Sequence, residues 1–227
     1  MQRVIRVLVV LVVLGLGALW GAAWFGREPN EPLGASFQRQ FAALTGRGDA
    51  AAPVPAGGIR LPAGMNMGGA FAMRDQDGRA VTQDSFGGTL LVGYFGYSFC
   101  PDVCPTELAT IANAFDLLTP GEAARATPLF VSVDPGRDTP EQLKGYVANF
   151  HPRMVGLTGT PEQVAAMAKQ FRVFYAKVQR PEMSEYLMDH SSFVYLIGAD
   201  GRVRALLRPQ SSAEDIAAAI RAQLPRA

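Results

Sequence analysis

The stretch Thr89-Leu-Leu-Val-Gly-Tyr-Phe95 leads into Phe99-Cys-Pro-Asp-Val-Cys-Pro105, and these two segments decide the fold. A continuous run of apolar, β-prone residues is typical of a strand that is buried on both faces of a sheet. The cysteine-bearing turn follows this strand, and a helix is expected from about Pro105 to Leu118. A buried strand, a reactive turn and a helix, in that order, indicate an α/β domain.

The next elements are a second buried strand and two helices with clear starting signals. Leu129–Val133 (LFVSV) repeats the continuous apolar pattern. Thr139-Pro-Glu-Gln142 supplies a capping Thr, a Pro at the first helical position and a Gln in the capping-box position. Thr160-Pro-Glu-Gln163 repeats this pattern and predicts a helix from Glu162 to Phe171.

Hairpins and a terminal helix complete the domain. An Asp-Gly turn signal lies inside Phe71–Val81, and another joins the expected strands Phe193–Ile197 and Val203–Leu207. Ser211 or Ser212 caps a last helix that runs to about Leu224. Strand, helix, strand, helix, hairpin, helix is the order of the thioredoxin fold. We therefore expect an α/β, thioredoxin-like central sheet flanked by helices.

The N-terminus predicts a membrane anchor. Two arginines precede an uninterrupted apolar run from Val7 to Phe25, which at roughly 1.5 Å per residue nearly matches a hydrocarbon core of roughly 30 Å. Residues 1–26 are interpreted as a transmembrane helix, with a cleaved signal peptide as the alternative. Residues 27–67 form an Ala/Gly/Pro-rich tether, and residues 68–227 form the thioredoxin-like domain. The basic end predicts that this domain lies outside the cytoplasm, on the periplasmic face if the chain is bacterial.

The overall charge is nearly balanced. The chain has 21 Lys and Arg against 20 Asp and Glu, with a formal net charge of +1. Nucleic acid binding relies on many cationic contacts to phosphates, so no nucleic acid partner is expected.

The two cysteines of the chain, Cys100 and Cys104, are the candidate reactive groups. A helix start favours thiolate over thiol, and a spacing of four places both sulfurs on one face of a helix. Such a pair has three uses: a structural disulfide, disulfide exchange, or binding of a soft metal ion. A disulfide in so short a loop stabilises little, and redox pairs usually have the C-x-x-C spacing.

A third ligand favours the metal site. His190 directly precedes the expected strand Phe193–Ile197, and in a thioredoxin-like sheet the loop entering this strand lies beside the redox turn. Two thiolates and one imidazole suit copper, as a trigonal Cu(I) site or, with an added oxygen ligand, a Cu(II) site. Zinc normally takes four ligands when structural. The other histidine, His151, is expected to cap carbonyls at a helix end or interact with the helix dipole.

Residues near the predicted site have weaker assignments. Asp189 is expected to accept a hydrogen bond from His190 or to hold its loop, and Asp102 to favour a bound cation or remain a solvated turn residue. Asp134 and Arg137 read either as a pair that stabilises a turn or as partner-facing charges. The tether methionines, Met65 and Met67, are expected to make apolar contacts.

The chain resembles the Sco/SenC family of copper proteins that serve cytochrome c oxidase. Three stretches carry the resemblance in family order: Gly93-Tyr-Phe-Gly-Tyr-Ser-Phe-Cys-Pro-Asp-Val-Cys-Pro-Thr-Glu-Leu108, Val131-Ser-Val-Asp-Pro-Gly-Arg-Asp-Thr-Pro-Glu141 and Asp189-His-Ser-Ser-Phe-Val-Tyr-Leu196. The resemblance spans residues 68–224. It implies that Cys100, Cys104 and His190 bind copper. It also implies delivery of copper, or of reducing equivalents, to the subunit of cytochrome c oxidase that holds the dinuclear copper site. Other copper chaperones are further candidate partners.

Three functions follow from this interpretation. The first is an extracytoplasmic copper chaperone, which is a binding protein rather than an enzyme. The second is a thiol-disulfide oxidoreductase that reduces the cysteines of the copper-receiving subunit and needs only Cys100 and Cys104. A peroxidase is the third and ranks lowest, because Tyr97 stands where a peroxidatic Thr-x-x-Cys motif needs Thr.

Overall fold

The computed structural model describes residues 58–59, 61–62, 65–181 and 184–224, together with residues 6, 15, 17 and 20. Apart from these four single residues, the predicted anchor, residues 1–26, and most of the predicted tether lie outside the described residues. Among the residues that are described, no helix is long and apolar enough to cross a bilayer.

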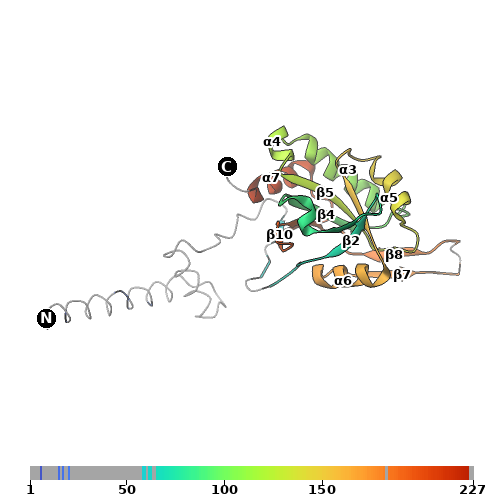
Figure 1. The fold of residues 1–227 in the computed structure, drawn as a ribbon, viewed down its shortest axis with the longest axis horizontal. Coiled ribbons are helices and arrows are strands. Elements are labelled where there is room, and N and C mark those ends of the chain that lie inside the picture. The colour runs from blue at the N-terminus through green and yellow to red at the C-terminus, as the bar shows by residue number, and fades with distance from the viewer. Residues whose placement is uncertain are drawn as a thin grey trace. The chain divides into compact units, whose positions relative to one another are not determined.

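Eight of the described strands form one mixed sheet at the centre of the domain (Figure 1). In spatial order they are β1 (Gly58–Ile59), β10 (Val203–Leu207), β9 (Val194–Ile197), β4 (Leu90–Gly96), β5 (Ala126–Ser132), β6 (Val155–Thr158), β2 (Ala72–Asp75) and β3 (Ala80–Thr82). The three central strands are parallel, with Gly96 opposite Ser132, and their neighbours on both sides are antiparallel. All seven residues of β4 are buried, as its continuous apolar run predicts.

Helices cover both faces of the sheet. Their bounds are η1 (Gln83–Phe86), α3 (Val103–Asp116), α4 (Pro120–Ala123), α5 (Pro140–Val147), α6 (Pro161–Phe171) and α7 (Ala213–Gln223). Figure 1 shows α6 on one side of the sheet and α3, α4, α5 and α7 on the other. Neighbouring residues of β4 divide between these faces: the Phe95 ring packs 5.7 Å from that of Phe171 at the end of α6, whereas Tyr94 faces the α3 side.

The predicted capping signals start their helices as expected. Thr139 and Thr160 each accept a hydrogen bond at 3.3 Å from the backbone N–H of the Gln in the capping-box position, and Ser212 caps α7. The strand and helix order, with the helices on both faces, is the predicted thioredoxin-like arrangement. Six of the described elements lack a sequence prediction: β1, η1, α4, β6 and the two strands of the hairpin formed by β7 and β8.

The hairpin of β7 (Tyr175–Val178) and β8 (Leu187–His190) forms a second, two-stranded sheet. Tyr175 pairs with His190 at its base. The expectation that His190 lies in a loop was therefore wrong, because His190 ends β8, which pairs with β7. The strand β7 is short and half-exposed, so its sequence gives little sign of a strand.

Part of the predicted tether packs against the domain. Gly58 and Ile59 pair with Leu207 and Leu206, so β1 becomes an edge strand of the main sheet. The Met67 side chain is 8% exposed and belongs to the hydrophobic core, as the expected apolar contact requires.

Candidate metal centre

The cysteine turn lies between the end of β4 and the start of α3. The helix begins at Val103, two residues before the predicted start, so Cys104 lies in its first turn and Cys100 lies in the turn ahead of it. The Cys100 N–H donates to the Tyr97 carbonyl oxygen at 3.2 Å and closes this turn. The idea that both sulfurs share one helix face was therefore wrong: the turn, not helical spacing, brings Cys100 back toward Cys104.

The structure brings the three predicted metal-binding side chains together. The two Sγ atoms and a ring nitrogen of His190 all lie within 4.8 Å of one another, and Cys104 Sγ is 3.3 Å from His190 Nε2. Cys104 is buried, and the other two residues are half-buried. Both cysteines are free thiols. Two soft sulfur donors and one imidazole nitrogen in this arrangement fit copper better than a hard cation that prefers oxygen ligands.

The two cysteines differ in acidity. A hydrogen bond from Cys104, together with bonds from His190 and from backbone N–H groups, lowers the pKa of Cys100 to about 3 despite its partial burial. The same bond to Cys100, together with burial, raises the pKa of Cys104. Cys100 is thus the more acidic and the more exposed thiol of the pair.

Two tyrosines enclose the imidazole. The rings of Tyr94 and Tyr97 each lie 6.0 Å from the His190 ring, edge to face at 86° and 85°. Burial raises the pKa of Tyr97 and, well beyond its ordinary value, that of Tyr94, so both hydroxyls stay protonated beside the thiols. The two tyrosines were missed as site residues. The signal for Tyr94 was its place in β4, on the face that also carries the cysteine turn.

An open pocket of about 280 Å³ leads to the site. Its walls are the cysteine turn, with Tyr97, Cys100, Pro101, Asp102 and Val103, and the end of the hairpin, with Leu187, Met188, Asp189, His190 and Ser192. One segment that carries a predicted ligand thus forms each wall, and Cys100 lies between them.

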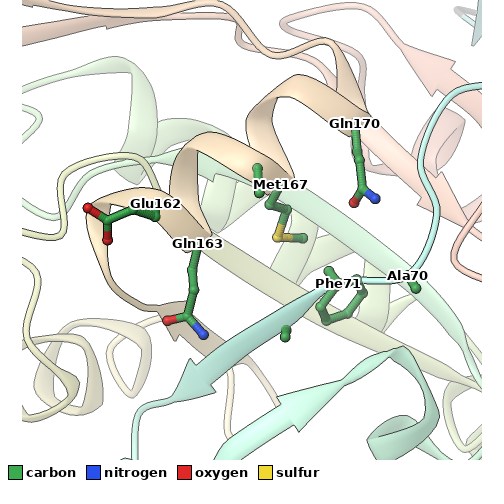
Figure 2. A pocket seen from close by; sticks show the side chains of 8 residues that line it. Ala70, Phe71, Glu162, Gln163, Met167 and Gln170 are labelled. Atoms are coloured by element: carbon green, nitrogen blue, oxygen red, sulfur yellow. The ribbon is translucent and has the colours of Figure 1, made fainter.

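A second pocket, of about 260 Å³, lies between β2 and α6 (Figure 2). Figure 2 shows Met167 above the Phe71 ring, with Glu162, Gln163 and Gln170 along the helix. Of the eight residues that line this pocket, Glu162 is the single ionisable one, so the pocket offers no cluster of metal-binding or nucleophilic groups. The cysteine turn remains the candidate site.

A buried carboxylate accepts hydrogen bonds from a residue of the segment that leads into the cysteine turn. Asp138 is fully buried and accepts hydrogen bonds from the Ser98 hydroxyl and the Ser132 hydroxyl, both at 2.5 Å, and from the Ser98 N–H at 3.1 Å. Ser98 is two residues before Cys100. Asp138 lies in the stretch Val131–Glu141 that carries the family resemblance, but sequence reasoning assigned it no role.

The neighbouring residues that the sequence singled out have mixed outcomes. Asp189 does not bind the His190 ring: successive residues of a strand point to opposite faces, and His190 Nδ1 instead lies 3.2 Å from the Ser191 carbonyl oxygen. Asp102 is exposed at the position before α3. His151 Nδ1 accepts the Arg153 N–H at 3.1 Å, so this ring nitrogen caps no carbonyl.

Asp134 and Arg137 form the predicted turn pair. Arg137 Nε lies 2.6 Å from Asp134 Oδ2, and the Arg137 N–H donates to the Asp134 carbonyl oxygen at 3.2 Å. Both side chains are largely buried, at 14% and 7% exposure, so this is not a solvated surface pair.

The glycine at the end of β4 predicts a test of the packing around Cys104. A Cβ atom on Gly96 would stand 2.7 Å from Cys104 Sγ and 3.1 Å from the Phe130 ring. Gly96→Ala is therefore expected to displace the sulfur and to lower the free energy of unfolding by about 1–3 kcal/mol. Chemical denaturation of the metal-free protein measures this loss. Gly145→Ala, at an exposed position of helix α5 with no atom within 4 Å of the new Cβ, is the control and should not destabilise. An unchanged Gly96→Ala stability would contradict the contact.

The comparison with known sequences covers the whole folded domain. The sequence profile of the SCO1/SenC family matches residues 60–225. The mitochondrial Protein SCO1 homolog 1 of Arabidopsis thaliana is 42% identical over 134 residues, which are 59% of this chain and 40% of that protein. The SCO2-like protein RP587 of Rickettsia prowazekii (strain Madrid E) is 41% identical over 153 residues, which are 67% of this chain and 74% of that protein. The chain thus spans less than half of the first relative.

Solved structures agree with the sequences. Arabidopsis thaliana ScoI with copper bound is 35% identical with a TM-score of 0.64, covering 69% of this chain and 97% of that one. Bradyrhizobium japonicum ScoI with copper bound is 37% identical with a TM-score of 0.63, covering 70% and 99%. BsSco, described with a disulfide switch and as a member of the Sco family of cytochrome c oxidase assembly proteins, is 26% identical with a TM-score of 0.55, covering 72% and 97%. The chain belongs to the SCO1/SenC family.

Proposed function

We propose that this protein is a copper chaperone that binds one copper ion through Cys100 Sγ, Cys104 Sγ and His190 Nε2. The observation that supports this assignment most directly is the meeting of these three donor atoms within 4.8 Å of one another at the foot of an open pocket. The copper bound by the similar ScoI structures supports the choice of metal.

The proposed recipient is the subunit of cytochrome c oxidase that holds the dinuclear copper site, since BsSco is described as belonging to a family of oxidase assembly proteins. Other copper chaperones are the proposed donors. Residues 1–26 are proposed to anchor the protein, with the domain outside the cytoplasm on the periplasmic face of a bacterial inner membrane. Retention of the protein in the membrane fraction after a high-salt wash tests the anchor. Recovery in the soluble fraction of a protein that lacks the anchor residues would contradict it.

Metal transfer to a partner requires the ligands to be released in sequence. Cys100 is the accessible thiolate, so it is the ligand that an incoming cysteine or histidine of the partner replaces first. Cys104 is buried, and the rings of Tyr94 and Tyr97, each edge to face with the imidazole, hold His190 in place during the exchange. The three ligands supply the soft donor set that copper requires.

The experiment is copper quantification on the full-length protein with and without reductant. The reduced wild type is expected to retain one copper per chain. An oxidised sample and the Cys100→Ala variant are expected to retain essentially none, because a chelate with one thiolate fewer cannot hold a soft ion tightly. Full copper in Cys100→Ala would overturn the assignment of this ligand, and an empty reduced wild type would overturn the function.

The acidity difference between the cysteines supports a second candidate function, a thiol-disulfide reductase. The Cys100 thiolate would attack a disulfide of the copper-receiving subunit and release one thiolate, leaving a mixed disulfide. Cys104 would then lose its proton and attack Cys100 Sγ, which releases the second partner thiolate. The partner gains two electrons, and a disulfide forms between Cys100 and Cys104. A thiol assay on a disulfide substrate measures this activity, which needs no histidine ligand.

A further inference from the structure

The histidine of the site stands on a hairpin that is separate from the main sheet. Among the described strands, β7 and β8 pair with each other alone, whereas β4, which leads to the cysteine turn, lies in the middle of the eight-stranded sheet. Figure 1 shows the hairpin projecting from the body of the domain. The main sheet constrains His190 through the chain, since Val194 at the start of β9, four residues later, pairs with Tyr94 of β4. The hairpin itself is not in that ladder, so the position of His190 also depends on the side chains that dock the hairpin.

Arg137 makes the polar contacts that dock the start of β8. Its Nε lies 2.6 Å from Asp134 Oδ2, and its Nη1 donates to the Tyr186 carbonyl oxygen at 3.0 Å. The Tyr186 hydroxyl donates to Asp134 Oδ1 at 2.9 Å and closes a ring of three groups. Tyr186 directly precedes β8, the strand that ends at His190. The ring thus joins the turn after β5 to the strand that carries the imidazole.

The same guanidinium also touches the cysteine turn. Its carbon lies 3.6 Å from the centroid of the Tyr186 ring and 4.8 Å from that of the Phe99 ring, and Phe99 is the neighbour of Cys100. At 14% exposure the group is shielded enough for cation–π and charged contacts to be worth more than at a surface. A planar guanidinium makes these stacked and bonded contacts at once, which a lysine ammonium cannot do.

We propose that Arg137 is a positioning residue for copper binding. By holding Tyr186 against Asp134 and stacking on Phe99, it fixes β8 relative to the cysteine turn, so that the His190 imidazole stays within reach of both sulfurs. The proposal rests on the proposed function, since it assumes that Cys100, Cys104 and His190 share one metal ion. It goes beyond that function because Arg137 touches none of the three ligands.

Arg137→Met tests the proposal in the full-length protein, because methionine keeps much of the apolar volume and removes the guanidinium. Competition with a chromophoric Cu(I) chelator is expected to show binding at least about tenfold weaker than wild type, the range typical of residues that orient a ligand. The electron paramagnetic resonance spectrum of the Cu(II) form is expected to lose nitrogen hyperfine coupling. The optical absorption band that arises from thiolate ligation is expected to remain. A role in stability alone would leave the nitrogen signal of the bound copper unchanged.

The decisive comparison is a double-variant cycle. If Arg137 acts through His190, then Arg137→Met combined with His190→Ala binds copper no more weakly than His190→Ala alone. Arg204→Met is the matched control: Arg204 pairs with Asp200 at 3.0 Å in the hairpin between β9 and β10, and its loss should leave copper affinity unchanged. Tyr186→Ala removes the ring on which Arg137 stacks and the hydroxyl that bonds Asp134, and it keeps the carbonyl that Arg137 also contacts. It is expected to weaken copper binding as well, and it is the second variant should Arg137→Met not fold.

The outcomes separate this proposal from the proposed function. If Arg137→Met and Tyr186→Ala both bound copper with the wild-type affinity and kept the nitrogen coupling, the positioning role would be overturned. The copper function would then still stand. If the loss of copper affinity in Arg137→Met added fully to that of His190→Ala in the double variant, the positioning role would also be overturned. Arg137 would then act independently of the imidazole. A wild-type protein that binds no copper would overturn the proposed function and this role with it.

Discussion

Replacing His190 with alanine is expected to lower Cu(I) affinity at least about a hundredfold while leaving thiol-disulfide exchange in place. The imidazole supplies one of three donors, and removing a ligand costs more than the 10–100-fold typical of residues that merely orient one. Exchange needs the two sulfurs alone. Its rate should fall only in part, because His190 is one of several groups that lower the pKa of Cys100.

Two measurements on the same sample check this result: chelator competition for Cu(I), and the rate of disulfide reduction. The control is His151→Ala, which removes the other histidine of the chain, a residue that bonds the Arg153 N–H outside the cluster of ligand atoms. It should bind copper like the wild type. If His190→Ala retained copper with wild-type affinity, the third ligand would have to be another group, and the two-thiolate site would fit the reductase better than the chaperone.

The local parts of the fold were predictable from the sequence. A buried strand such as β4 reveals itself through a continuous apolar run, and helices α5 and α6 through a capping Thr followed by Pro. These signals act between residues a few positions apart, so a single sequence contains them. The ligand set was predictable for a similar reason, because a chain with two cysteines and two histidines offers few alternatives.

The parts that escaped prediction depend on contacts between distant segments. Asp138 meets Ser98 across 40 residues of sequence, and Arg137 meets Tyr186 across 49. A charged residue after a strand usually reads as a solvated turn, and nothing local distinguishes a buried one. The strand that carries His190 was missed because its partner, β7, is short and half-exposed and shows no clear alternation.

Asp138→Ala is expected to lower the free energy of unfolding by about 3 kcal/mol, because it leaves two hydroxyls and the Ser98 N–H without their buried acceptor. The size of the loss should depend on pH. Burial, the largest cause, raises the pKa of Asp138 above its unfolded value, although bonds from Ser132 and Ser98 oppose the rise. The folded protein then binds more protons than the unfolded chain between these two pKa values.

This proton uptake determines whether the contribution of Asp138 to stability rises or falls with pH. The contribution of Asp138 to stability is complete below its unfolded pKa and falls as the pH rises through its folded pKa. The deficit of Asp138→Ala, measured by denaturant unfolding of the metal-free protein, should therefore be larger at pH 4 than at pH 7. Asp77→Ala is the control with the opposite sign: the hydrogen bond from Lys144 lowers the pKa of this exposed carboxylate, so its small contribution is lost as the pH falls. A deficit of Asp138→Ala that grew from pH 4 to pH 7 would mean that the buried group is stabilised as the charged form. In that case the cysteine turn would rest on a carboxylate that the serines hold ionised.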